Sequence, residues 1–117
     1  MTHVETRHAI HPDHARGMDT AQLRQHFLVE GLFAAGQIRL TYTHYDRFVV
    51  GGAVPDGAPL TLDAIDETRT PSFLDRREMG IVNIGGPGRV EAAGQGWDMA
   101  NGDVLYLGMG AGAVTFL

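Results

Sequence analysis

The sequence has 117 residues, a formal net charge of -5 and no cysteine. This length allows one domain with a single core, and 44% apolar with 20% charged residues is typical of a folded chain. The acidic balance argues against a nucleic-acid partner, while the lack of cysteine excludes disulfides, thiolate zinc sites and cysteine nucleophiles. No segment has the apolar run of a signal peptide or a bilayer span, so we expect a cytoplasmic protein.

Residues 1–18 are polar, rich in histidine and without periodicity, which predicts an arm or an extended lead-in. Within this arm His8, His11 and His14 recur at every third position. Imidazole is the commonest metal ligand, so one interpretation is a metal site. Pro12 interrupts any helix that would place the three rings on one face. The other interpretation, which we favour, is an arm that packs on the rest of the protein.

A helix start is encoded after this arm. Asp19 precedes TAQLRQHF, and Gln22 follows it three residues later. This spacing is that of a capping box, so we predict one short N-terminal helix. Leu23 and Phe27 are expected to form its buried face.

From residue 37 the apolar period changes to two. QIRLTYTHY predicts a half-buried strand, with His44 on its apolar face as a hydrogen-bonded core residue rather than a ligand. Further short strands are predicted in RFVVGGAV, PLTLD, MGIVNIGG, RVEAAG, GWDMANGD, DVLYLG and AVTFL, and MGIVNIGG looks fully buried. Short strands at roughly ten-residue spacing with glycine-rich turns are typical of an antiparallel β-sandwich or barrel. We therefore predict a mainly β domain over residues 19–117.

The last segments raise two separate questions. VLYLGMGAGA places Gly108, Gly110 and Gly112 after a strand, a formal match to the dinucleotide fingerprint, but β-branched residues follow where that fingerprint needs a helix. We interpret it as a turn. AVTFL then ends the sequence as an apolar strand, and an unpaired apolar edge invites aggregation. We expect either pairing within an oligomer or a chain cut from something longer, and we favour the cut.

Charged residues gather at two strand ends. Asp46 and Arg47 end one strand, and DRRE, with Arg76 and Arg77 at its centre, precedes another. One interpretation is an ion-pair cluster at a corner of the fold, because charge beside a core needs pairing. The other is that Arg47, Arg76 or Arg77 binds an anionic substrate, because a guanidinium matches a carboxylate in a two-bonded fork.

Four segments taken together resemble a known family. They are IHPDHARGMDTAQLRQHFLVEGLF, YTHYDRFVVGG, SFLDRREMGIVNIGG and DVLYLGMGAGAVTF. In this order they are similar to the N-terminal part of 5-keto-4-deoxyuronate isomerase, also called 4-deoxy-L-threo-5-hexosulose-uronate ketol-isomerase. The resemblance runs from about residue 8 to residue 117, and residues 75–86 are its most specific part. It implies that this chain is the N-terminal half of a protein with two cupin-like β-sandwich or jelly-roll halves.

The resemblance also implies a function. Family members are cytoplasmic, zinc-dependent, oligomeric (commonly hexameric) enzymes of pectin and uronate breakdown. They convert 5-dehydro-4-deoxy-D-glucuronate to 3-deoxy-D-glycero-2,5-hexodiulosonate. Their zinc ligands are a His-x-His motif, a following Glu and a distant His, all in the C-terminal half, and this chain has no His-x-His. We therefore expect zinc in the parent enzyme, no metal on this chain and no activity of the 117 residues alone. The alternative is a non-catalytic cupin-like oligomerisation or sugar-binding module.

Overall fold

The computed structural model describes residues 2–117, which form nine strands, two short α-helices and one 3-10 helix. In chain order these are β1 (Thr2–Arg7), α1 (Pro12–Ala15), α2 (Thr20–Phe27), β2 (Gln37–Thr43), β3 (Val49–Val54), β4 (Leu60–Leu62), η1 (Asp66–Thr68), β5 (Met79–Val82), β6 (Gly88–Ala92), β7 (Gln95–Met99), β8 (Val104–Leu107) and β9 (Val114–Phe116). None of the described helices is long and apolar enough to cross a membrane.

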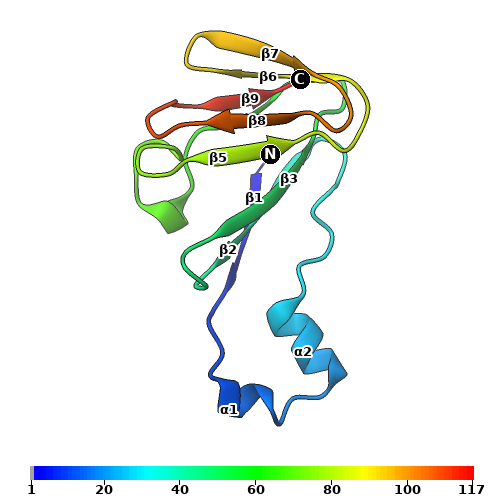
Figure 1. Ribbon diagram of the computed structural model, residues 1–117, viewed down its shortest axis with the longest axis vertical. Helices are drawn as coiled ribbons and strands as arrows, with labels where there is room; N and C mark the ends of the chain where they lie inside the picture. The colour runs from blue at the N-terminus through cyan, green and yellow to red at the C-terminus, as the bar shows by residue number, and fades with distance from the viewer. Residues whose placement is uncertain (1) are drawn as a thin grey trace.

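The strands form three sheets that lie against one another (Figure 1). In the first, β2 pairs in parallel with β1 and antiparallel with β3. The second has the order β4-β9-β6-β7, and the third pairs β5 with β8; all of their ladders are antiparallel. The predicted mainly β sandwich is confirmed, while its assignment as a cupin stays a prediction.

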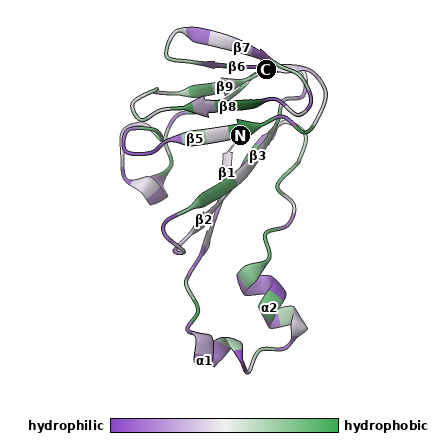
Figure 2. Cartoon of the chain, viewed as in Figure 1, coloured by the Kyte–Doolittle hydropathy of each residue, from purple (hydrophilic) through white to green (hydrophobic). Residues whose placement is uncertain are grey.

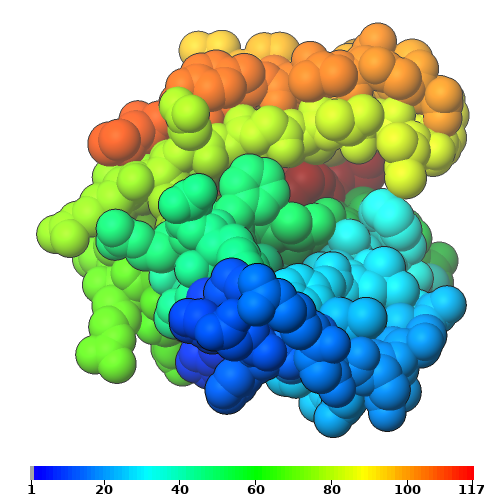
Figure 3. All heavy atoms as spheres, turned by 60° about the horizontal axis from the view of Figure 1, so that its bottom comes forward, coloured from blue at the N-terminus to red at the C-terminus, as the bar shows by residue number. Residues whose placement is uncertain are grey.

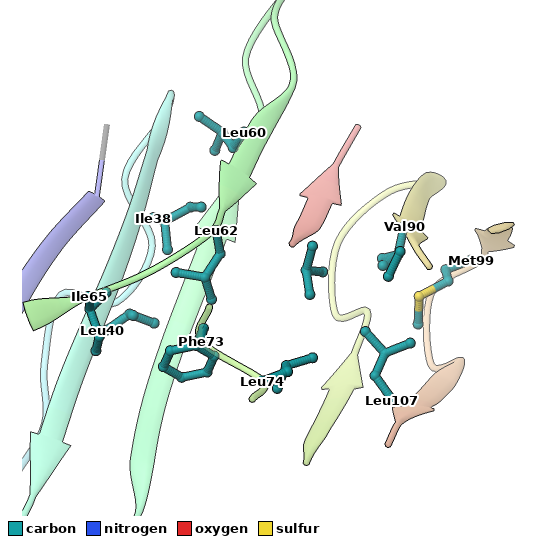
Figure 4. Close-up of a cluster of buried hydrophobic side chains, with 12 residues drawn as sticks. Ile38, Leu40, Leu60, Leu62, Ile65, Phe73, Leu74, Val90, Met99 and Leu107 are labelled. Atoms are coloured by element: carbon teal, nitrogen blue, oxygen red, sulfur yellow. The ribbon is translucent and has the colours of Figure 1, made fainter. Parts of the chain in front are cut away.

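One core joins the three sheets (Figure 4). Leu74 and Val114 are completely buried, and apolar burial of this kind supplies most of the stabilisation of a domain this small. The full cluster consists of Ile38, Leu40, Leu60, Leu62, Ile65, Phe73, Leu74, Val90, Ala92, Met99, Leu107 and Val114.

The strand at the end of the sequence is paired on both sides. Val114 to Phe116 pair with Leu62 to Leu60 of β4 on one side and with residues 92 to 90 of β6 on the other. The hydroxyls of Thr61 and Thr115 also lie 3.0 Å apart across the ladder. β9 is therefore an interior strand of its sheet and not an unpaired apolar edge. Its partners are distant in sequence and leave no local signal.

The predicted N-terminal arm contains regular structure. Residues 2–7 form β1, whose register with β2 runs from Thr2 opposite Ile38 to Arg7 opposite Thr43. Pro12 then opens α1, where the Asp13 backbone N–H donates to His11 Nδ1 at 3.1 Å. The chain thus has two short helices where one was predicted, since Pro12 starts a helix at the position where it was expected only to break one.

The capping box of α2 is confirmed, but its buried face is not. The Asp19 carboxylate accepts from the Gln22 backbone N–H at 2.8 Å, and the Gln22 side chain accepts from the Asp19 N–H at 3.0 Å. Leu23 and Phe27 are 39% and 48% exposed, which contradicts the prediction. Both helices project away from the sheets (Figure 1), and α2 carries apolar positions, green in Figure 2. The ring of Phe27 meets only the turn after β2, with its centroid 6.2 Å from that of Tyr45. The space-filling view shows the helical segment on the surface of the molecule (Figure 3).

Strand β5 is only half-buried, although the sequence predicted full burial. Met79 and Ile81 point toward the core, while Val82 is 58% exposed. On the paired strand Val104 and Tyr106 are exposed in the same way. Among the described residues no strand or helix covers the outer face of this two-stranded sheet. A continuous apolar run in the sequence cannot predict this.

Candidate functional site

The three arginines predicted to bind substrate lie near the turn between β2 and β3. Arg47 occupies that turn with Asp46, and both residues adopt the left-handed backbone conformation, with φ of 53° and 54°. Arg77 reaches this turn and donates from Nη1 to the Arg47 carbonyl oxygen at 2.7 Å. The fold therefore brings Arg47 and Arg77 together, whereas Arg76 is exposed and has no side-chain hydrogen bond among the described residues.

The ion-pair interpretation of this cluster is wrong for residues 2–117. None of the three arginines belongs to an ion pair there. The neighbouring acids have other partners, because Asp75 accepts from the Ser72 N–H at 3.2 Å and Glu78 accepts from the Tyr106 hydroxyl at 2.6 Å. The three guanidinium groups at this corner therefore form no ion pair with any acid of residues 2–117.

Arg89, in contrast, shows what a paired arginine looks like in the same molecule. It donates to Asp98 at 2.9 Å and to Glu91 at 3.2 Å across β6 and β7. These hydrogen bonds, that to Asp98 first, raise the pKa of Arg89 by favouring its charged form. Arg77 has no such partner, so its charge stays available to an external anion.

Arg77 is nevertheless held in place. Its guanidinium carbon lies 5.4 Å from the centre of the Tyr42 ring, a cation–π contact. The hydrogen bond to the Arg47 carbonyl uses one of the five N–H groups of the guanidinium. The remaining N–H groups form no hydrogen bond with the described residues, which leaves an oriented donor set beside the turn.

Aromatic rings continue from Tyr42 to the end of β1. The ring of His44 stacks on His8 with centroids 4.6 Å apart and meets Tyr42 edge-on at 5.2 Å. His44 is exposed, so its prediction as a hydrogen-bonded core residue is wrong. The alternation of β2 ends at Thr43, and the backbone N–H of His44 donates to the Arg7 carbonyl at 2.9 Å instead.

The histidines of the N-terminal segment do not converge on one point. The ring of His8 stacks on that of His44, while the ring centroids of His11 and His14 lie 6.5 Å apart with the two rings tilted by 59°. Among residues 2–117 no group of three or more His, Asp or Glu side chains could hold a metal ion. The metal interpretation of His8, His11 and His14 is therefore not supported by the described residues.

An open depression of about 400 Å³ adjoins the aromatic rings. It is lined by Thr6, Tyr42, His44, Asp66, Glu67 and Arg69. No pattern in the sequence singled out Asp66, Glu67 or Arg69. A signal was present in Ile65, an apolar residue before that loop, which is buried in the core and anchors η1 beside the end of β2.

The glycine-rich segment after β8 is a turn, as predicted. Gly110 and Gly112 have φ of 85° and 80°, a conformation that glycine adopts without strain. Within the described residues β9 follows these glycines and no helix does. The geometry that a pyrophosphate needs at a helix N-terminus is therefore absent from this segment.

Comparison with curated proteins shows strong similarity over nearly the whole chain. A 4-deoxy-L-threo-5-hexosulose-uronate ketol-isomerase of Cereibacter sphaeroides is 66% identical, over 99% of this chain and 42% of its own length. The protein of the same name from Agrobacterium fabrum is 64% identical with the same shares. A ketol-isomerase 1 of Bacteroides thetaiotaomicron is 49% identical over 98% of this chain and 41% of its own length. No family model matches the chain.

These relatives confirm the resemblance predicted from the sequence. The chain spans about two fifths of the length of the curated relatives that it matches.

Proposed function

We propose that the protein containing this sequence is a ketol-isomerase that converts 5-dehydro-4-deoxy-D-glucuronate to 3-deoxy-D-glycero-2,5-hexodiulosonate. The observation that carries the proposal is the 66% identity, over 99% of the chain, to a relative named as such a ketol-isomerase. Ketol isomerisation moves a proton between adjacent carbons, so it needs a base and a group that stabilises the developing oxyanion. The described histidines and acids do not converge into that arrangement, and we infer that residues 2–117 alone are inactive.

The proposal includes a zinc ion that is bound by residues outside 2–117. It also includes a cytoplasmic location and assembly into a homo-oligomer. Its support is the family resemblance of the four sequence segments. We assign no step of the reaction through that ion to this chain. Metal analysis of the full-length protein tests this part: stoichiometric zinc, with activity lost to a chelator and restored by zinc, is the expected result.

The role that we assign to the described chain is to hold the substrate carboxylate at Arg77. This arginine is oriented by the Arg47 carbonyl and the Tyr42 ring and is not paired with an acid. A guanidinium in a fixed orientation can donate two parallel hydrogen bonds to a carboxylate. Arg47 and Arg76, both exposed nearby, add positive charge around this position.

Arg77→Gln in the full-length protein tests this role. Losing a charge-assisted hydrogen bond to the substrate is expected to raise KM by about tenfold and to leave kcat nearly unchanged. The matched control is Arg16→Gln, an exposed arginine of the helical segment that pairs with Asp13. Wild-type KM and kcat in Arg77→Gln would refute the role, whereas no turnover of the ketouronate by the wild-type protein would favour a non-catalytic module.

A further inference from the structure

The depression beside β2 contains polar groups that the protein itself leaves unused. Of the three tyrosines, Tyr45 accepts from the Ile10 N–H and Tyr106 donates to Glu78. The hydroxyl of Tyr42 has no hydrogen-bond partner among the described residues, although Tyr42 is only 8% exposed and lines the depression. This hydroxyl is not sealed from solvent, because Ser72 Oγ is the one buried side-chain polar atom without a partner among residues 2–117. It can therefore both donate to and accept from a ligand in the depression.

Charged groups in the depression are unused as well. Asp66, Glu67 and Arg69 line it, and none of them belongs to an ion pair of the described chain. The 3-10 helix η1, which carries Asp66 and Glu67, is held in place at its start. Ile65 is buried in the core, and the Thr68 hydroxyl donates to the Ile65 carbonyl at 3.1 Å. Two carboxylates, a guanidinium and a tyrosine thus line one depression.

The chemistry of this set selects among ligand classes. A metal ion is disfavoured, because the described residues contain no cluster of three or more potential ligands. An anion is disfavoured as well, because Asp66 and Glu67 outnumber Arg69, and Arg77 stacks on Tyr42 without lining the depression. A ligand with many hydroxyls fits, since carboxylates accept from hydroxyls, a guanidinium donates to them and a tyrosine hydroxyl does both.

We propose that this depression binds a neutral, hydroxyl-rich carbohydrate of about the size of a monosaccharide. Its volume of about 400 Å³ lies in the range of small-molecule sites. The exposed ring of His44 supplies flat apolar surface, whereas Tyr42 is only 8% exposed and offers little of its ring. Asp66, Glu67 and Arg69 supply hydrogen bonds to hydroxyls. The site goes beyond the proposed isomerase function, whose substrate is an anion.

Isothermal titration calorimetry of the full-length protein tests this site with two probes. D-galactose and D-galacturonate differ only at C6, where a hydroxymethyl group is replaced by a carboxylate. We expect saturable binding of D-galactose in the millimolar range and weaker binding of D-galacturonate. Tyr42→Phe, which keeps the ring, should weaken D-galactose binding by about fivefold, and Asp66→Asn by about tenfold. Asp56→Asn, an exposed acid outside the depression, should leave it unchanged.

Three results would overturn the site. They are no saturable D-galactose binding, tighter binding of D-galacturonate than of D-galactose, and unchanged affinity in both variants of the depression. If Tyr42→Phe fails to fold, Asp66→Asn decides alone, because Asp66 is exposed and supports no core contact. The calorimetry requires no turnover, so its result is independent of the isomerase assay.

Discussion

Apolar side chains are buried in the strand sandwich and largely exposed in the helical segment of residues 8–35. In the sandwich, Leu74 and Val114 are completely buried between sheets. In the helical segment neither helix has a buried residue, and Phe27 and Phe33 are 48% and 58% exposed. Local signals such as the Asp19 capping box are enough to define where a helix starts, whereas burial depends on which element lies opposite.

The largest expected effect compares one leucine from each region. Leu74→Ala removes a side chain with no exposed surface, so it should lower the free energy of unfolding by about 2–5 kcal/mol. Leu23→Ala, on exposed α2, should change that free energy by no more than about 0.5 kcal/mol. Urea unfolding of both variants measures the difference. Equal losses would mean that α2 packs on a surface outside residues 2–117.

A smaller effect isolates the helical segment from the sandwich. Asp19→Ala removes the acceptor for the Gln22 N–H and should destabilise α2 by about 1 kcal/mol. Faster hydrogen exchange of the α2 amides is the expected readout, with global unfolding unchanged because no residue of α2 belongs to the buried core. Asp19→Asn keeps an acceptor and serves as the control. A lower global unfolding midpoint in Asp19→Ala would show that the two regions are coupled.

The same contrast explains how much of the fold could be predicted from the sequence. The capping box at Asp19, the alternation through Ile38 and Leu40, and the strands predicted in RVEAAG and GWDMANGD all depend on neighbours within a few residues, and all are confirmed. The partners of β9 and the parallel pairing of β1 depend on segments far along the chain. Nothing in their local pattern encodes that choice.

The candidate site divides along the same line. The sequence singled out Arg47 and Arg77, because adjacent charges at strand ends are visible in the letters, and the fold joins them through the Arg47 carbonyl. The sequence contains no pattern that associates Tyr42 with Asp66 and Arg69. These residues line one depression because the burial of Ile65 in the core places η1 beside the end of β2. A site formed by several elements at the end of a sheet is therefore found from the packing of those elements in space, and not from the spacing of its residues in the sequence.

The smallest expected effect concerns the exposed face of the sandwich and is set by pH. The hydrogen bond that Tyr106 donates to Glu78 raises the pKa of Tyr106, so the folded chain keeps this proton at a pH where the unfolded chain loses it. The stability from this pair is therefore fully present below the unfolded pKa and is lost as pH rises toward the folded pKa. Tyr106→Phe should lower the urea midpoint slightly at neutral pH and not at strongly alkaline pH.

The titration of Tyr106 itself, followed by carbon NMR of its ring, checks the cause of that shift. In Glu78→Gln the charged acceptor is gone, so the pKa of Tyr106 should return toward the ordinary tyrosine value. Glu67→Gln is the control, because it removes an acid that is not a cause of the raised pKa of Tyr106 and should leave that pKa unchanged. If the titration of Tyr106 is the same in the wild-type protein and in Glu78→Gln, Glu78 does not hold this proton. The outer face of β5 and β8, where Val82 and Val104 are exposed, would then add little to stability, and the partly buried Met79 and Ile81 of the inner face would carry the contribution of β5.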